Sequence, residues 1–150
     1  DFVPSRGLGD VYKRQLLACT CVSMARMAIE ACDAYVKERH AFGRPLAGFQ
    51  VTRHRLAEMA TKEAAARSFT AVVAERYRSG EDVTVDVAMA KNVAVEACSF
   101  VTDAAVQIFG GMGYMRESLV ERLYRDARLF PIGGGTTEIM RELISKRRGV

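Results

Sequence analysis

Three long stretches of the chain repeat apolar or small residues at intervals of three and four. In the first, from residue 16 to 39, these are Leu17, Cys21, Met24, Met27, Ala28, Ala31 and Tyr35. In the second they are Leu56, Met59, Ala66, Phe69, Val73 and Tyr77, and in the third, residues 85–109, they are Met89, Val93, Ala97, Phe100, Ala104 and Ile108. This spacing marks one face of an α-helix, and no stretch alternates as a half-buried strand does. The chain is therefore expected to be all-α.

Glycine, serine and proline mark the ends of these helices. The stop signals are Gly43 with Pro45, Ser79 with Gly80, and Gly110 with Gly111. A shorter helix is expected over residues 119–129, closed by a proline, and a final helix over 137–146 with Ile139, Leu143 and Ile144 facing inward. Long helices joined by short loops favour an antiparallel, up-and-down four-helix-type bundle with a short extra C-terminal helix.

Size and charge exclude several classes of function. With 150 residues, 49% of them hydrophobic, the chain suffices for one globular core. The net charge of +4 is spread along the helical segments, so we expect no nucleic-acid partner. No uncharged apolar run approaches the roughly 18 residues of a membrane span, and Arg14 with Gln15 interrupts anything like a secretory leader. The expected location is cytoplasmic, without membrane contact.

The cysteines and histidines lack the spacing of metal ligands. Cysteines occupy positions 19, 21, 32 and 98, and the histidines are His40 and His54. Residues two apart on a helix point in different directions, so Cys19 and Cys21 are a poor ligand pair. We expect buried, reduced thiols, histidines with surface or packing roles, and no metal site.

A glycine-rich segment lies just before the last expected helix. Residues 131–140 read PIGGGTTEIM. Three glycines permit positive φ and the close approach of a ligand to the backbone, and the threonine hydroxyls can cap the following helix. Taken alone, the segment is equally readable as a plain link between two helices.

Four segments in order resemble the C-terminal helical domain of the acyl-CoA dehydrogenase family. They are KERHAFGRPL at residues 37–46, Phe49-Gln50, VQIFGGMGY at 106–114 and RDARLFPIGGGTTEI at 125–139. The similarity covers residues 16–150. It implies a fragment of a homotetrameric flavoenzyme in which FAD lies between a β-domain and this bundle, with its ADP half reaching the bundle of a neighbouring subunit.

The resemblance assigns cofactor contacts to individual positions. They are Arg39, Phe42, Gln50, Gln107, Gly110, Gly111, Thr136, Thr137 and Glu138, with Gly135 bordering the substrate. Arg39 matches an arginine that meets the FAD pyrophosphate, and Phe42 and Gln50 match nearby flavin-contacting positions. The segment from Gln107 to Gly111 matches one that approaches FAD from a partner subunit. The segment 136–138 matches a loop that touches the adenosine part of FAD.

Plain alternatives stand beside these assignments. Arg39 has the character of a helix-end cation, which the macrodipole favours. Gly110 and Gly111 would also serve only to end a helix. Phe42, an aromatic residue after a helix, is often part of a core.

The carboxylate base of the family is missing at both positions where members place it. Many members have a glutamate in the glycine loop, where this chain has Gly134. A subgroup that includes the isovaleryl-CoA and long-chain enzymes, which the local sequence resembles, places the glutamate at the start of the first bundle helix, where this chain has Lys13. Glu138 is a weak candidate for a substitute base. Glu30 and Asp126 are expected to be surface or ion-pair residues.

Residues 1–15 do not resemble the connection that precedes this domain in the family. We therefore expect this segment to be non-native, fused just after the position of the base.

The parent protein is then expected to oxidise acyl-CoA to trans-2-enoyl-CoA with FAD, passing electrons to an electron-transfer flavoprotein. The fragment alone is expected to be inactive. The alternative is a catalytically silent flavin or acyl-CoA binding and oligomerisation module.

Overall fold

Small side chains form the buried face of the first long helix, α1 (Leu8–Glu38). The computed structural model describes residues 8–150. The residues of α1 that are fully buried are Ala18, Cys21, Ala25, Ala28, Cys32 and Val36. Their intervals of three and four produce a narrow stripe along which another helix can approach closely. Met27, expected in this stripe, is instead 44% exposed.

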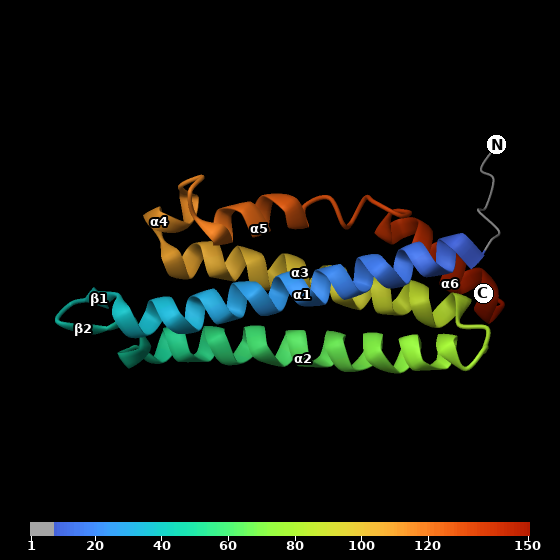
Figure 1. Cartoon of the computed structure of the whole chain (residues 1–150), viewed down its shortest axis with the longest axis horizontal. Coiled ribbons are helices and arrows are strands. Elements are labelled where there is room, and N and C mark those ends of the chain that lie inside the picture. The colour runs from blue at the N-terminus through green and yellow to red at the C-terminus, as the bar shows by residue number, and fades with distance from the viewer. Residues whose placement is uncertain (1–7) are drawn as a thin grey trace.

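Three long helices lie side by side and form the body of the molecule (Figure 1). Besides α1 they are α2 (Gln50–Arg78) and α3 (Thr84–Phe109). The short helix α4 (Gly111–Tyr114) and α5 (Leu119–Ala127) follow, and α5 packs on α3 and α1. The last helix, α6 (Thr137–Arg148), packs on α3 at the other end of the bundle (Figure 1). The expectation of an all-α bundle with a short C-terminal helix is confirmed.

The central helix α3 contacts α1, α2, α5 and α6. Its buried residues are therefore mostly small and occupy much of its circumference. They include Val87, Ala90, Ala94, Cys98, Val101 and Ala105. The stripe expected for this helix is wrong at Val93, which is 39% exposed. The expected stripe included the larger apolar side chains of this helix. The positions where neighbouring helices approach most closely are instead occupied by small residues.

The first helix begins earlier than expected. Leu8 opens α1, whereas the sequence placed the start near Leu16. Val11 packs against the cluster formed by Val73, Val83, Val87 and Ala90, which gives these additional turns, about two, an apolar contact. Residues 1–7 of the expected non-native segment lie outside the described residues, and its origin stays a prediction.

A small hairpin and a 3-10 turn connect α1 to α2. The hairpin pairs β1 (His40–Ala41) with β2 (Arg44–Pro45) in antiparallel register, and η1 (Leu46–Gly48) follows. Phe42 and Gly43 form the turn with φ values of +51° and +79°. Positive φ at both central residues is the geometry of a type I′ turn, which matches the twist of the strands. The expectation of no strand is wrong at this one place.

The core differs from the expectations in two further details. Met140 is the fully buried residue of α6, whereas Ile139, Leu143 and Ile144 are only partly buried. Cys21, Cys32 and Cys98 are buried free thiols as expected, but Cys19 is exposed.

By length and composition, α1 meets the criterion for a membrane span. An 18-residue window within Gly9–Glu38 has a mean hydropathy of 1.2. Core helices of soluble proteins meet the same criterion, and α1 packs its small residues on α3 and α2.

Candidate functional site

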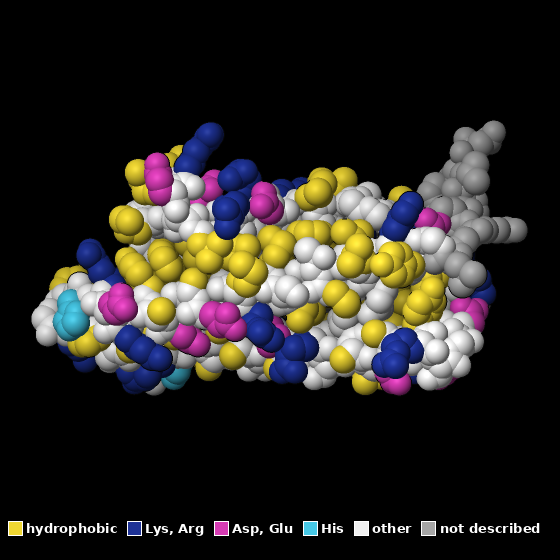
Figure 2. Space-filling view, viewed as in Figure 1, with side chains coloured by type: hydrophobic (Ala, Val, Ile, Leu, Met, Phe, Trp, Pro, Cys, Tyr) yellow, Lys and Arg dark blue, Asp and Glu magenta, His cyan; other side chains and the backbone are white. Residues whose placement is uncertain are grey.

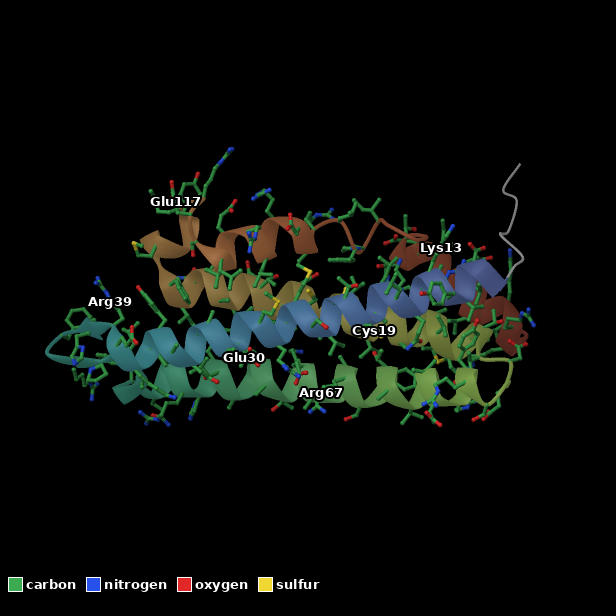
Figure 3. The ribbon with its side chains drawn as sticks, in the orientation of Figure 1. Lys13, Cys19, Glu30, Arg39, Arg67 and Glu117 are labelled. Atoms are coloured by element: carbon green, nitrogen blue, oxygen red, sulfur yellow. The ribbon has the colours of Figure 1, made fainter. Side chains whose placement is uncertain are left out.

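Arg39 lies at one end of the bundle, directly after α1. Its amide donates to Tyr35 O (2.8 Å), and its carbonyl accepts from the Leu46 amide (2.8 Å), so the backbone is fixed on both sides. Its side chain is exposed and makes no ion pair or side-chain hydrogen bond with another described residue. Figure 3 shows Arg39 extending away from the bundle at this end. The guanidinium is therefore available to an external anion.

An aromatic stack ties the end of α3 to the end of α1. The rings of Tyr35 and Phe109 lie parallel with centroids 4.0 Å apart. Tyr35 Oη also donates to Phe109 O (3.3 Å). This contact brings the exposed Gln107 and the glycines that follow to the same end as Arg39.

Phe42 and Gln50 complete this end. Phe42 is 95% exposed, which rules out the alternative of a core residue. Its ring meets Phe49 edge to face at 6.3 Å. Gln50 opens α2, and its side-chain amide lies 3.3 Å from His54 Nε2.

The glycines at the end of α3 leave open space beside the backbone. Gly110 has φ +60° and ends α3, as the sequence indicated. No heavy atom lies within 4 Å of where a Cβ would stand at Gly110 or Gly111. A free guanidinium and an uncovered backbone at the same end of the bundle fit a ligand that combines an anionic pyrophosphate with flat rings. The residues present therefore fit the phosphate-bearing part of a dinucleotide.

The glycine loop lies at the opposite end, before α6. Gly134 and Gly135 have φ values of +68° and +97°, as the glycine run suggested. Thr136 Oγ1 accepts from the Ile139 amide (3.3 Å), which confirms that the hydroxyl caps α6. Thr137 and Glu138 form the first turn of α6, with Glu138 exposed.

Leu17 of α1 occupies the space beside Gly134. A Cβ added to Gly134 would overlap Leu17 Cδ1. Lys13 stands four residues before Leu17, hence on the same side of the helix, and Figure 3 shows it at the α6 end of the bundle. The two positions at which the family places its base are therefore at the same end, although neither is a carboxylate here.

Other carboxylates are poor substitutes for the base. Hydrogen bonds from the backbone and from Thr136 lower the pKa of Glu138, which makes it a weaker proton acceptor. Glu30 pairs with Arg26 at 3.1 Å, and Asp126 with Arg125 at 3.8 Å, so both are ion-pair residues as expected.

Sequence reasoning missed Lys91, which lies beneath the glycine loop. It is 1% exposed, and its Nζ donates to Gly133 O (2.6 Å) and to Gly135 O. Burial lowers the pKa of Lys91, and the neighbouring Arg14 lowers it further. The available signal was that Lys91 is the one charged residue in the apolar run 87–95 of the sequence.

The buried thiols do not form a further site. The neighbouring Cys98 thiol and burial raise the pKa of Cys21, and burial raises that of Cys32 to about 12. Cys21 and Cys32 therefore stay protonated at neutral pH, whereas the hydrogen bond with Cys21 lowers the pKa of Cys98. Among residues 8–150, no three potential ligands gather where they could hold a metal ion.

One chain does not bring all the expected cofactor residues together. Arg39 follows the last residue of α1, whereas Leu17, near its start, contacts the glycine loop. At about 1.5 Å per residue, these positions are roughly 30 Å apart. Figure 3 shows the same separation between Arg39 and Lys13.

Comparison with known proteins decides the family. Residues 11–149 match the acyl-CoA dehydrogenase C-terminal domain. The chain belongs to the acyl-CoA dehydrogenase family. The match confirms the family that the four segments indicated, and it begins inside the segment expected to be non-native.

Several relatives show how much of an acyl-CoA dehydrogenase is present. A probable acyl-CoA dehydrogenase of Bacillus subtilis is 40% identical over 87% of this chain and 34% of its own length. A subunit of the caffeyl-CoA reductase-Etf complex of Acetobacterium woodii is 38% identical over 86% of this chain and 34% of its own length. The crystal structure of a probable acyl-CoA dehydrogenase from Mycobacterium abscessus superposes with a TM-score of 0.92 and 51% identity, covering 93% of this chain and 37% of the other. The chain thus spans about a third of the length of these relatives.

Proposed function

We propose that this bundle is part of a full-length enzyme that oxidises acyl-CoA to trans-2-enoyl-CoA with FAD. The observation that carries the proposal is the free guanidinium of Arg39 at the same end of the bundle as the uncovered backbone of Gly110 and Gly111, in a chain that matches the dehydrogenase family. Bound FAD supplies the acceptor for the β-hydride of the acyl group. The bundle alone lacks two thirds of the relatives' length, and we expect it to be inactive.

The two ends of the bundle serve different FAD molecules. Arg39 matches a contact to the pyrophosphate, and Thr136 to Glu138 match contacts to the adenosine. These two parts are neighbours within FAD, but Arg39 lies roughly 30 Å along α1 from Leu17, which borders the loop that carries Thr136 to Glu138. Each FAD must therefore take the first set from one subunit and the second from another. This supports an oligomer, and we propose the homotetramer that the family resemblance implies.

The rest of the protein is proposed to cover an apolar face of the bundle. Figure 2 shows a band of hydrophobic side chains along the visible face of the molecule. Exposed apolar residues on the helices of this face include Leu16, Met27 and Tyr124. A patch of this kind on an isolated bundle favours association. In the full-length enzyme we assign it to contacts with the missing domains.

The catalytic base of the parent is proposed to stand at position 13. A carboxylate there would lie one helical turn from Leu17, which contacts Gly134. It would approach the site from α1 instead of from the loop. Lys13 does not serve as this base unless its charge is suppressed. The proposal therefore includes a glutamate at this position in the native parent.

The electron partner is proposed to be an electron-transfer flavoprotein. One relative is named as a subunit of a caffeyl-CoA reductase-Etf complex, which supports a partner of this kind. The same name describes a reductase, so the test should measure both directions of electron flow.

A second candidate function follows from the empty base positions. With Lys13 and Gly134 native, the parent would bind flavin and acyl-CoA without removing a proton.

Anaerobic flavin bleaching of the full-length parent with a panel of acyl-CoA thioesters tests these candidates. Rapid bleaching that is lost when a glutamate at position 13 is changed to glutamine supports the dehydrogenase. Bound FAD that no acyl-CoA bleaches supports the silent module, and failure to bind FAD contradicts both.

A further inference from the structure

Lys91 is buried in the core, and its side-chain nitrogen hydrogen-bonds to carbonyls of the glycine loop instead of pairing with a carboxylate. Lys91 is 1% exposed and has no ion-pair partner among the described residues. The Nζ atom donates to two carbonyl oxygens, those of Gly133 and Gly135. A buried ammonium is costly, and an apolar side chain of similar volume would fill the same space at lower cost. The packing of α3 alone therefore does not account for a lysine here.

The two hydrogen bonds fix the orientation of two peptide groups in the glycine loop. In a trans peptide the C=O and the following N–H point in opposite directions. Because both carbonyls point to Lys91, the amides of Gly134 and Thr136 point away from it. Neither amide has a hydrogen-bond partner among the described residues. The loop thus presents two free donors on the side away from Lys91, and Gly134 and Gly135 between them both have positive φ.

We propose that Lys91 is a positioning residue of the acyl-CoA dehydrogenase site, which holds the glycine loop so that the Gly134 and Thr136 amides face the bound ligand. The identity of the ligand rests on the proposed function. The clamp, by which we mean the two hydrogen bonds from Lys91 to the loop carbonyls, does not rest on it. Charge-assisted hydrogen bonds are stronger than neutral ones, so one side chain can hold a loop that glycine would otherwise leave mobile.

Hydrogen exchange in the FAD-loaded full-length enzyme tests the clamp without reference to activity. The reporters are the Gly133 and Thr137 amides, which donate across the loop to Leu129 O (2.8 Å) and Pro131 O (3.1 Å). Lys91→Met keeps an unbranched side chain only one heavy atom shorter than lysine and removes its donors. We expect these two amides to exchange at least tenfold faster in this variant. Lys146→Met is the matched control, because it removes an exposed ammonium of α6 that pairs with Glu142.

Kinetics then show whether the clamp matters to the site. In Lys91→Met we expect the rate of flavin reduction by acyl-CoA to fall at least tenfold while FAD content stays at the wild-type level. A residue with only a structural role would lower the melting temperature and leave the reduction rate unchanged at a temperature where the variant is folded. An unchanged reduction rate in the folded variant would overturn the proposal. So would exchange of both reporter amides at the wild-type rate.

Two further outcomes are separable. Lys91→Leu repeats the test if the methionine variant does not fold, and failure of both to fold would overturn the proposal by showing that the bundle itself needs Lys91. If the wild-type enzyme shows no flavin reduction with any acyl-CoA, the proposed function fails, and the exchange comparison still decides whether Lys91 clamps the loop.

Discussion

Leu17 and Gly134, which are far apart in the sequence, are in contact at one end of the bundle. The side chain of Leu17 fills the position that a Cβ on Gly134 would occupy, and Gly134 has φ +68°. Both facts select glycine at this place in the loop. A glutamate there would be strained at this positive φ, and the Leu17 side chain would have to move to make room for its Cβ. The structure is therefore already adapted to a loop without the carboxylate.

Substitution of Gly134 by alanine should destabilise the protein in a way that depends on Leu17. The positive φ costs roughly 1–2 kcal/mol, and the overlap adds about 1–3 kcal/mol. In a double-mutant cycle measured by urea unfolding, Gly134→Ala should cost less in a Leu17→Ala background. Gly111→Ala is the control, since its Cβ enters open space. Equal costs in both backgrounds would show that the two residues do not interact.

Loss of the Arg39 guanidinium should weaken FAD binding by the full-length enzyme. A hydrogen bond to a charged group is worth about 1.5–3 kcal/mol, so Arg39→Met should raise the FAD dissociation constant about ten- to hundredfold. The control Arg26→Met removes an exposed arginine that pairs with Glu30, and it should leave the FAD dissociation constant unchanged. Fluorescence titration of the apoenzyme measures both values. An unchanged constant in Arg39→Met would leave Arg39 as a helix-end cation only.

The stack between Tyr35 and Phe109 should couple the ends of α1 and α3. Tyr35→Phe removes the hydrogen bond to the Phe109 carbonyl and keeps the ring, so we expect a loss of about 1 kcal/mol. Tyr35→Leu should cost a further 0.5–1.5 kcal/mol or so, because the ring pair is lost as well. Urea unfolding measures both. Identical stability of the two variants would contradict a contribution from the stack.

Asp82 should contribute stability that disappears in acid. Its Oδ1 accepts from the Thr84 amide (3.0 Å) and Thr84 Oγ1 (2.6 Å), and these bonds lower its pKa below the usual 3.8. The unfolded chain therefore binds the proton more tightly, so the contribution is complete above pH 3.8 and falls as pH drops through the lowered pKa. Asp82→Ala should be destabilising at pH 7 and less so at pH 3. A cost independent of pH would refute the assignment.

Local signals in the sequence predicted the helices better than their buried faces. Gly110 ends α3 and Gly80 follows the end of α2, because each glycine adopts a positive φ, of +60° and +83°, that other residues disfavour. Met27 and Val93 were assigned to the core because they are large and apolar, but both are substantially exposed. The buried side of a helix is the side that its neighbours approach most closely, and small side chains permit this close approach.

The sites depend on contacts that no local pattern records. Lys91 is separated from Gly133 by 42 residues, yet the two are hydrogen-bonded. The sequence identified the glycine loop and Arg39 through motifs, but it did not indicate that they lie at opposite ends of one bundle. That separation follows from the unbroken length of α1. It is the reason for placing each FAD between two subunits.

Subunit complementation is the most direct test of this arrangement. Arg39→Met damages one end of the bundle and Glu138→Arg the other, and each variant of the full-length enzyme should bind little FAD. Tetramers that contain both variants, purified through a different tag on each variant, should regain up to about half of the wild-type FAD content, because one of the two sites between unlike subunits takes both ends intact. If these mixed tetramers bind no more FAD than the single variants, each site is built from one chain, and the account is wrong.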